Sequence, residues 1–204
     1  MSIEIQPVAK EPKRERGKQR VAALIDAGAE LFAEKGYEAT TMTEIASRAG
    51  AAIGSLYQFF PSKEALAEAL FNRFAERAAA AFQRVEELAP GRSARELADL
   101  FIDYKLGLGT DRDAAIALSG AVAGIVDRRK PLGDALRGRI AAILSAANRS
   151  LDEHEAAAAA VIVNQVMKMI PALGVTEGER AAALIGEARK LMALYIAEVL
   201  RGRR

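Results

Sequence analysis

The sequence predicts an all-α protein of about nine helices: a small N-terminal three-helix domain, a long connecting helix and a larger helical C-terminal domain. Three observations lead to this prediction. Apolar residues recur at steps of three and four along most of the chain, as on one face of a helix, and no alternating strand pattern is found. Two unusually short helical segments flank a glycine at residue 50. Of the 204 residues, 51% are apolar, which is enough to build a sizeable core.

A first helix is expected ahead of residue 36. Its apolar residues repeat at helical spacing, and Gly36 follows them where the helix should end. The residues of this stripe are Val21, Leu24, Ile25, Gly28, Leu31 and Phe32.

The second helix starts at a capping signature. Thr41 is followed three residues later by Glu44, so the Thr41 hydroxyl can accept from the Glu44 amide while the Glu44 carboxylate accepts from the Thr41 amide. This pattern sets the start of the helix at Met42 or Thr43. Gly50 follows barely two turns later, and a left-handed backbone conformation there would end the helix.

A third helix is expected from about Ala52 to the residue before Pro61, since proline disfavours helical geometry in the residue ahead of it. Ile53, Leu56 and Phe60 are expected to point inward. Helices this short need a shared core, because isolated helices below ~12–15 residues are marginal in water. Two short helices joined by a glycine turn are the layout of a helix-turn-helix.

The segment from residue 20 to residue 66 resembles the DNA-binding domain of the TetR family of bacterial transcriptional regulators, of the TetR/AcrR type. The resemblance implies a helix-turn-helix DNA-binding domain at residues 16–61 and a helical ligand-binding and dimerisation domain at residues 62–204. It also implies a transcriptional regulator, favoured as a repressor, that binds a near-palindromic operator as a dimer and that a small effector releases. The residues that carry the resemblance include Gly36, Thr40, Thr41, Ile45, Ala46, Ala49, Gly50, Leu56, Tyr57, Phe60 and Lys63.

Candidate DNA contacts lie on and beside the recognition helix, the second helix of the helix-turn-helix. Ser55 and Gln58 are three residues apart and opposite Ile53 and Leu56, so they are expected to face the groove. Gln58 suits an adenine edge, and Ser55 suits several bases. Tyr57 and Lys63 resemble the family's phosphate contacts, which position the protein without reading sequence. Further contacts to the DNA backbone are expected from Thr41, Thr43 and Ala52.

One departure from the family pattern is Ala51-Ala52-Ile53, which stands where valine and then serine or another small residue is more usual. With Ala52 at the helix start, no side-chain hydroxyl caps the recognition helix, a loss of roughly 0.5–2 kcal/mol relative to serine. The free amides and the dipole of this helix end favour an anion, so a DNA phosphate is a candidate to replace the cap.

The net charge of +2 is too small to indicate a nucleic-acid binder by itself. The distribution is more informative, because six Lys or Arg stand against two Glu from Lys10 to Arg20. Such a run is typical of a solvated terminus, but directly ahead of a helix-turn-helix it is expected to contact phosphates or the minor groove. Residues 1–15 are therefore expected to form a disordered basic arm.

Apolar spacing predicts further helices beyond the helix-turn-helix. A helix over residues 62–88 is long enough to join two domains, and another is expected over residues 93–108. The most apolar run, residues 114–126, is expected to be one buried helix, since its 13 residues fall short of the ~20 that span a bilayer. Pro131 suits the first turn of the next helix.

The last two predicted helices, residues 153–170 and 176–201, carry apolar arcs wider than one core requires. Because a surface helix normally shows an apolar stripe of about 100°, the surplus predicts burial against a second subunit. The resemblance implies the same, since TetR-like proteins dimerise through their two C-terminal helices. A homodimer through residues 152–201 is therefore expected, with two recognition helices about one DNA turn apart.

Effector candidates are polar groups on otherwise apolar helices of the second domain, together with the apolar side chains beside them. The few charges in these helices favour a hydrophobic or aromatic effector over a sugar or a phosphate. The candidates are Phe101, Asp103, Tyr104, Ser119, Val122, Asn164, Gln165 and Met167.

No motif favours an enzyme, a cofactor or a metal site. His154 is the only histidine and lies among acidic residues at a helix start, and the chain has no cysteine. The N-terminus shows no secretory signal, so a cytoplasmic location without membrane insertion is expected. Two alternatives stay open: a regulator that answers to a protein partner or to no effector, and a helical ligand-binding protein that has lost DNA binding.

Overall fold

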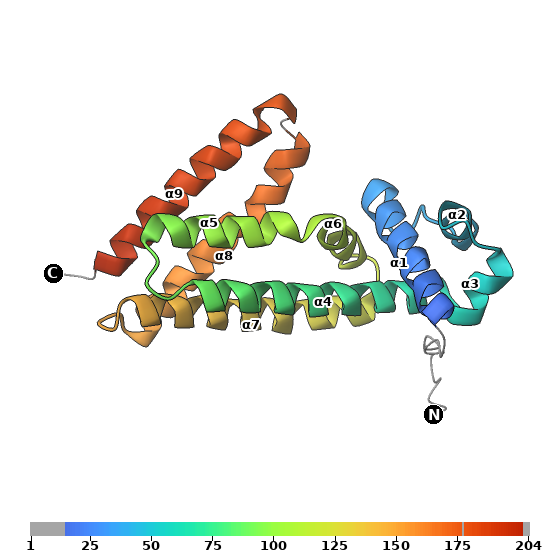
Figure 1. The fold of residues 1–204 in the computed structure, drawn as a ribbon, viewed down its shortest axis with the longest axis horizontal. Helices are drawn as coiled ribbons and strands as arrows, with labels where there is room; N and C mark the ends of the chain where they lie inside the picture. The colour runs from blue at the N-terminus through green and yellow to red at the C-terminus, as the bar shows by residue number, and fades with distance from the viewer. Residues whose placement is uncertain (1–14, 177, 202–204) are drawn as a thin grey trace. The chain divides into compact units, whose positions relative to one another are not determined.

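The computed structural model describes residues 15–176 and 178–201, which contain nine α-helices, one short 3₁₀ helix and no strand (Figure 1). The all-α prediction is confirmed. The elements are α1 (Glu15–Lys35), α2 (Met42–Arg48), α3 (Ile53–Phe59), α4 (Lys63–Leu88), α5 (Ala94–Gly107), α6 (Gly109–Leu118), α7 (Ala123–Ala147), α8 (Glu153–Thr176), η1 (Gly178–Arg180) and α9 (Ala181–Arg201).

The chain divides into two compact units, and each is described by itself. Unit 1 comprises Met1–Arg77 with Gly109–Arg129, and unit 2 comprises Ala78–Leu108 with Lys130–Arg204. The chain passes from one unit to the other inside α4, between α5 and α6, and inside α7. The boundary between functional domains at residues 61 and 62, which the resemblance implies, stays a prediction.

The predicted basic arm, residues 1–15, lies outside the described residues except for Glu15, the first residue of α1. The second half of the basic run is therefore helical, because Arg16, Lys18 and Arg20 belong to α1.

The core of unit 1 forms where α1 packs against α2 and α6, and where α2 meets α3. α1 and α4 approach closely at Gly28, where an added Cβ would lie 2.6 Å from Leu66 Cδ2. With seven residues each, α2 and α3 depend on this shared burial, as predicted. Fully buried side chains here include Leu24, Phe32, Ile45, Leu56, Leu66 and Leu70.

Ile53 was predicted to point into this core, and that prediction is wrong. Its side chain is 40% exposed, whereas Leu56 and Phe60 are buried. A step of three residues leaves Ile53 about 60° away from Leu56 around the helix axis. The core of unit 1 therefore buries the side of α3 that carries Leu56, and Ile53 lies at the edge of the exposed side.

The single buried helix predicted at residues 114–126 is also wrong. α6 ends at Leu118 and α7 begins at Ala123, so a turn separates them. Leu118 and Ile125 are both fully buried, on either side of this turn. Gly120 lies in the turn, and glycine disfavours a continuous helix because of its backbone freedom.

Pro131 lies inside α7 and not in its first turn as predicted. A proline inside a helix removes one amide donor and crowds the carbonyl four residues earlier, here that of Asp127. Residues 127–130 are exposed, so water can satisfy this carbonyl. α7 nevertheless begins at Ala123, eight residues before the proline, because burial of Ile125 in the core outweighs the preference of Pro131 for a first turn.

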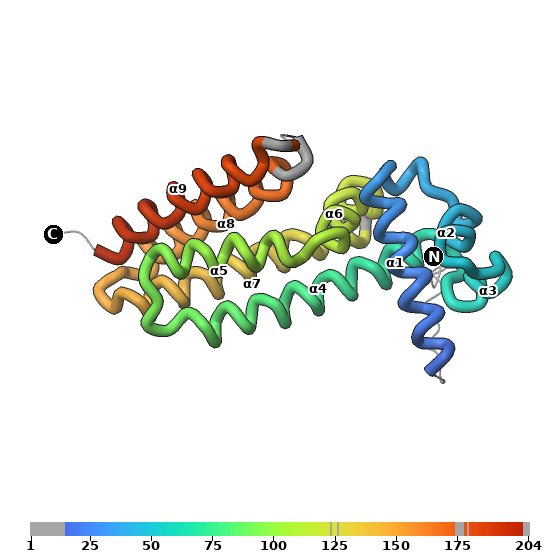
Figure 2. Tube along the Cα trace, turned by 45° about the horizontal axis from the view of Figure 1, so that its top comes forward, coloured from blue at the N-terminus to red at the C-terminus, as the bar shows by residue number. Residues whose placement is uncertain are grey.

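In unit 2, α5, α8 and α9 pack on one another, and Figure 2 shows α8 and α9 side by side. An aromatic cluster lies at its centre. Phe82 stacks on Phe101 with ring centroids 6.3 Å apart and meets Tyr104 edge-on at 5.0 Å. The Arg139 guanidinium covers the Phe82 ring at 4.8 Å and donates to Glu86 Oε1 at 2.6 Å.

α8 is, within residues 15–176 and 178–201, the one helix long and apolar enough by length and composition to cross a membrane, over Glu153–Leu173. The same pattern describes the core helix of a soluble protein, and α8 packs on α5 and α9. One of its faces is buried and the other is not. Large apolar side chains exposed on α8 and α9 are Val161, Ile162, Met169, Leu191 and Leu194, which we call the α8–α9 apolar face.

Candidate nucleic-acid interface

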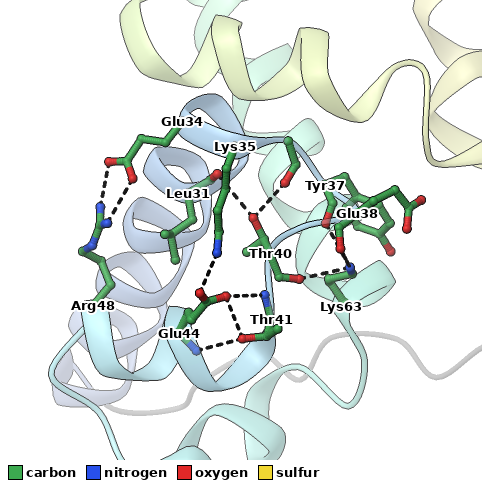
Figure 3. Close-up of polar contacts among 11 residues, drawn as sticks. Leu31, Glu34, Lys35, Tyr37, Glu38, Thr40, Thr41, Glu44, Arg48 and Lys63 are labelled. Atoms are coloured by element: carbon green, nitrogen blue, oxygen red, sulfur yellow. Dashed lines mark hydrogen bonds and ion pairs between the residues drawn. The ribbon is translucent and has the colours of Figure 1, made fainter.

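The first turn of α2 is held by the predicted capping box, which is confirmed. Thr41 Oγ1 accepts from the Glu44 amide at 3.3 Å, and Glu44 Oε2 accepts from the Thr41 amide at 2.9 Å. Lys35 of α1 donates to Glu44 Oε1 at 2.6 Å, and this contact, together with those to Thr41, lowers the pKa of the Glu44 carboxyl to about 2 (Figure 3). Gly50 ends the turn after α2 with φ +60°, as predicted.

The last turn of α2 is fixed to α1 by Arg48 (Figure 3). Its guanidinium donates to both carboxylate oxygens of Glu34, at 2.9 and 3.0 Å, and to Glu30 at 3.1 Å. The Arg48 hydrogen bonds lower the pKa of Glu34. Because the carboxylates of Glu30 and Glu34 bind this guanidinium, Arg48, the basic residue of α2, points toward α1.

The ammonium of Lys63 faces the loop between α1 and α2. Lys63 Nζ donates to the carbonyl oxygens of Tyr37 at 2.9 Å, Thr40 at 3.1 Å and Glu38 at 3.5 Å, and it lies 4.2 Å from the centroid of the Tyr37 ring (Figure 3). The Tyr37 hydroxyl donates to Glu64 Oε1 at 2.8 Å, and burial together with this contact raises the pKa of Tyr37. We call these contacts the Lys63 clamp. A lysine has three N–H donors, so a phosphate would have to share them with the loop carbonyls.

α3 exposes most of its surface. Its N-cap, Ala52, makes no side-chain hydrogen bond, as predicted, and Leu56 is its buried residue. Tyr57 is 50% exposed and Gln58 is exposed, and neither side chain has a hydrogen-bond partner within the described residues. Thr43 is likewise exposed, on the first turn of α2.

Arg20 ends the basic run that was expected to contact phosphates, but the sequence reasoning did not single it out. Its Nη1 donates to Ser55 Oγ at 3.4 Å, which brings an exposed guanidinium of α1 beside the recognition helix. No carboxylate pairs with Arg20 in the part of the chain that the structure describes. The available signal was its position in the run of basic residues, one helical turn ahead of the buried Leu24.

The predicted effector residues separate into two groups. Four of them are buried in unit 2: Phe101 and Tyr104 join the aromatic cluster, and Asn164 and Met167 lie on the buried face of α8. Burial raises the pKa of Tyr104 to about 12. Asn164 is 2% exposed, and its side-chain amide has no hydrogen-bond partner among residues 15–176 and 178–201.

The other four effector candidates have different surroundings. Ser119 and Val122 are buried in unit 1, where the Ser119 hydroxyl donates to the carbonyl of Ala115. Asp103 pairs with Arg189 of α9. Gln165 is exposed on α8. Six of the eight residues therefore lie in unit 2, and Ser119 and Val122 lie in unit 1.

A family model described as "Bacterial regulatory proteins, tetR family" matches residues 24–70. The HTH-type transcriptional repressor KstR2 of Rhodococcus jostii (strain RHA1) is 46% identical over 55 residues, which is 27% of each protein, and KstR of the same strain is 36% identical over 88 residues, 42% of this chain and 38% of KstR. The chain thus matches well under half the length of these curated relatives.

Two solved structures share the fold over most of the chain. A transcriptional regulator of Aquifex aeolicus VF5 superposes with a TM-score of 0.68 at 20% identity, covering 86% of this chain and 98% of that one. FadR of Bacillus subtilis, solved in complex with stearoyl-CoA, superposes with a TM-score of 0.63 at 23% identity, covering 84% of this chain and 97% of that one.

Proposed function

The chain belongs to the TetR family of bacterial regulatory proteins, and from this premise we propose that it is a DNA-binding transcriptional repressor of the cytoplasm. It binds a near-palindromic operator as a homodimer and is released by a small, mainly apolar effector. One observation carries the proposal: Tyr57 and Gln58 of α3 are exposed without a partner in the described residues, while Glu44 and Arg48, the charged groups of α2, are engaged within unit 1.

The DNA contacts divide into reading and positioning groups. Gln58 reads a base edge, with an adenine as the preferred partner, and Ser55 assists. Tyr57, Lys63, Thr41, Thr43 and the amide of Ala52 contact the DNA backbone and set the register. Arg20 joins this second group, because an exposed guanidinium without a carboxylate partner in the described residues is free to bind a phosphate.

The homodimer forms through residues 152–201. The support is the α8–α9 apolar face, whose five large apolar side chains are left exposed by two helices that pack on each other. Large apolar side chains left exposed on two packed helices favour burial against a partner, and a two-fold dimer repeats one face against itself.

The effector binds in unit 2. The support is Asn164, a residue that is 2% exposed and whose side-chain amide makes no hydrogen bond within the described residues, so the amide is available to pair with a bound molecule. The buried residues Phe101, Tyr104 and Met167 of the same unit favour an apolar effector with one hydrogen-bonding group. A similar protein, FadR of Bacillus subtilis, was solved with stearoyl-CoA, so long-chain acyl thioesters are the class to try first.

Selection of bound duplexes from a random DNA pool tests the proposed function. We expect enrichment of a near-palindrome with half-sites about one helical turn apart. Light scattering at micromolar protein concentration should give the mass of a dimer. Failure to enrich any duplex, or a monomeric mass, would overturn the corresponding part of the proposal.

Release from the enriched duplex tests the effector class. Stearoyl-CoA is expected to lower the affinity for DNA, and free coenzyme A serves as the control without an acyl chain. Asn164→Leu should keep DNA binding and weaken the response to the acyl compound. A response to free coenzyme A equal to that of stearoyl-CoA would contradict an apolar effector.

A further inference from the structure

The first turn of α3 carries a large apolar side chain that the core does not use. Ile53 is 40% exposed, and its neighbours in the chain are the small residues Ala52 and Gly54. A Cβ added at Gly54 would meet no atom within 4 Å, so the space beside Ile53 is open. Ile53 is therefore the bulky side chain that the first turn of α3 exposes, since Leu56 is buried.

Ile53 lies on the same exposed arc of α3 as Tyr57 and Gln58, of which Gln58 is a predicted base contact. Helical geometry sets Ile53 about 40° from Tyr57 around the helix axis, and Gln58 about 100° further on the same exposed arc. In helix-turn-helix proteins the N-terminal residues of the recognition helix contact base edges. Ile53 opens this helix, since α3 begins with it.

The chemistry of the major groove offers an apolar side chain one specific partner. The 5-methyl group of thymine is the one alkyl group that base pairs present there, and the polar groups are hydrogen-bond donors or acceptors. We infer that Ile53 reads a thymine in each half-site through this methyl group. The inference rests on the proposed function, because it requires that α3 enter the major groove.

The expected position of the thymine follows from the helix rise. Five residues separate Ile53 from Gln58, which corresponds to about 7.5 Å along the helix, or roughly two base-pair steps of ~3.4 Å. The thymine should therefore lie about two base pairs from the base that Gln58 contacts. Burial of one methyl group corresponds to about a fourfold change in affinity for each half-site.

A uracil scan of the enriched operator tests this inference. Uracil keeps the hydrogen-bonding groups of thymine and lacks the methyl group, so each thymine is replaced in turn by deoxyuridine. For the wild-type protein we expect one position per half-site at which uracil weakens binding about fourfold. Ile53→Ala should bind thymine and uracil equally at that position, and Ile53→Val should keep part of the difference.

The matched control is Ile116→Ala. Ile116 is an isoleucine of α6 in the same unit, 51% exposed, and it should keep the full discrimination between thymine and uracil. Thermal unfolding is followed for each variant, and Ile53→Val covers the case in which alanine fails to fold.

Equal binding of thymine and uracil by the wild-type protein at every position would overturn the inference. So would a discrimination that survives Ile53→Ala. Both results leave the protein a sequence-specific DNA binder, whereas a failure to enrich any duplex removes the proposed function and this inference with it.

Discussion

The two helices of the helix-turn-helix, α2 and α3, have seven residues each and are held in opposite ways. α2 has a complete capping box, an ion pair at each end and three buried residues. α3 has no side-chain cap, no charged residue and one buried residue, Leu56. The difference shows how a small domain separates its scaffold from its reading surface. The charged groups of α2 hold that helix to α1, whereas the side chains of Tyr57 and Gln58 on α3 make no hydrogen bond within the described residues and are available to DNA.

Leu56→Ala should have the largest effect, because it removes the one buried anchor of α3. Deleting a fully buried leucine costs about 2–5 kcal/mol, so the free energy of unfolding should fall by that amount and DNA binding should be lost. Chemical denaturation measures the change. Gln58→Ala, at an exposed position of the same helix, is the control and should leave stability unchanged; an equal loss from both would contradict the contrast between the two faces of α3.

Lys63→Ala tests the Lys63 clamp and the predicted phosphate contact together. Loss of hydrogen bonds from a charged group costs about 1.5–3 kcal/mol, so the free energy of unfolding should fall within this range. A phosphate contact also contributes ~0.9 to the slope of log affinity against log salt, which should fall accordingly. Arg20→Ala is the comparison, with the same change in slope and unchanged stability. If the slope is unchanged in Lys63→Ala, Lys63 does not contact a phosphate and serves only in the Lys63 clamp.

Gln58→Ala should change which sequence is bound while leaving the fold intact. Loss of a paired adenine contact relaxes discrimination at one base position by ~1–3 kcal/mol. Binding to operators with each substitution at that position measures this effect. A uniform loss over all operators would instead assign Gln58 to the DNA backbone.

Exchanging the caps of the two helices should shift stability in opposite directions. Thr41→Ala should destabilise unit 1 by about 0.5–2 kcal/mol, whereas Ala52→Ser should stabilise it by a similar amount. If a DNA phosphate takes the place of the missing cap, the Ala52→Ser variant should melt higher without binding DNA more tightly. Thermal unfolding and DNA titration of both variants separate the two effects.

Lowering the pH should weaken the contacts that fix α2 to α1. No comparable effect is expected for α3, which has no charged residue. The pKa of Glu44 is about 2 in the folded protein and 4.5 ordinarily, so its contribution is present above pH 4.5 and is lost as the pH falls toward 2. Glu44→Gln should make stability less dependent on pH over this range. A pH profile identical to that of the wild type would contradict the role of the Lys35–Glu44 pair.

The sequence alone was sufficient wherever the signal is local. The start of α2 at Met42 follows from Thr41 and Glu44, its end from Gly50, and the end of α4 at Leu88 from the Ala-Pro-Gly that follows. Each of these signals involves residues within a turn of one another, so the chain needs no distant contact to express it.

The tertiary structure decided the features that depend on which surface of a helix finds a partner. It exposed Ile53, turned the Lys63 ammonium to the loop carbonyls of residues 37–40, carried α7 through Pro131 and buried the Asn164 amide. Periodicity gives the direction of a side chain only to within a wide arc, and it does not say which neighbouring helix fills that arc. The DNA-reading helix could thus be located from the sequence, whereas the side chains it offers to DNA were determined by packing.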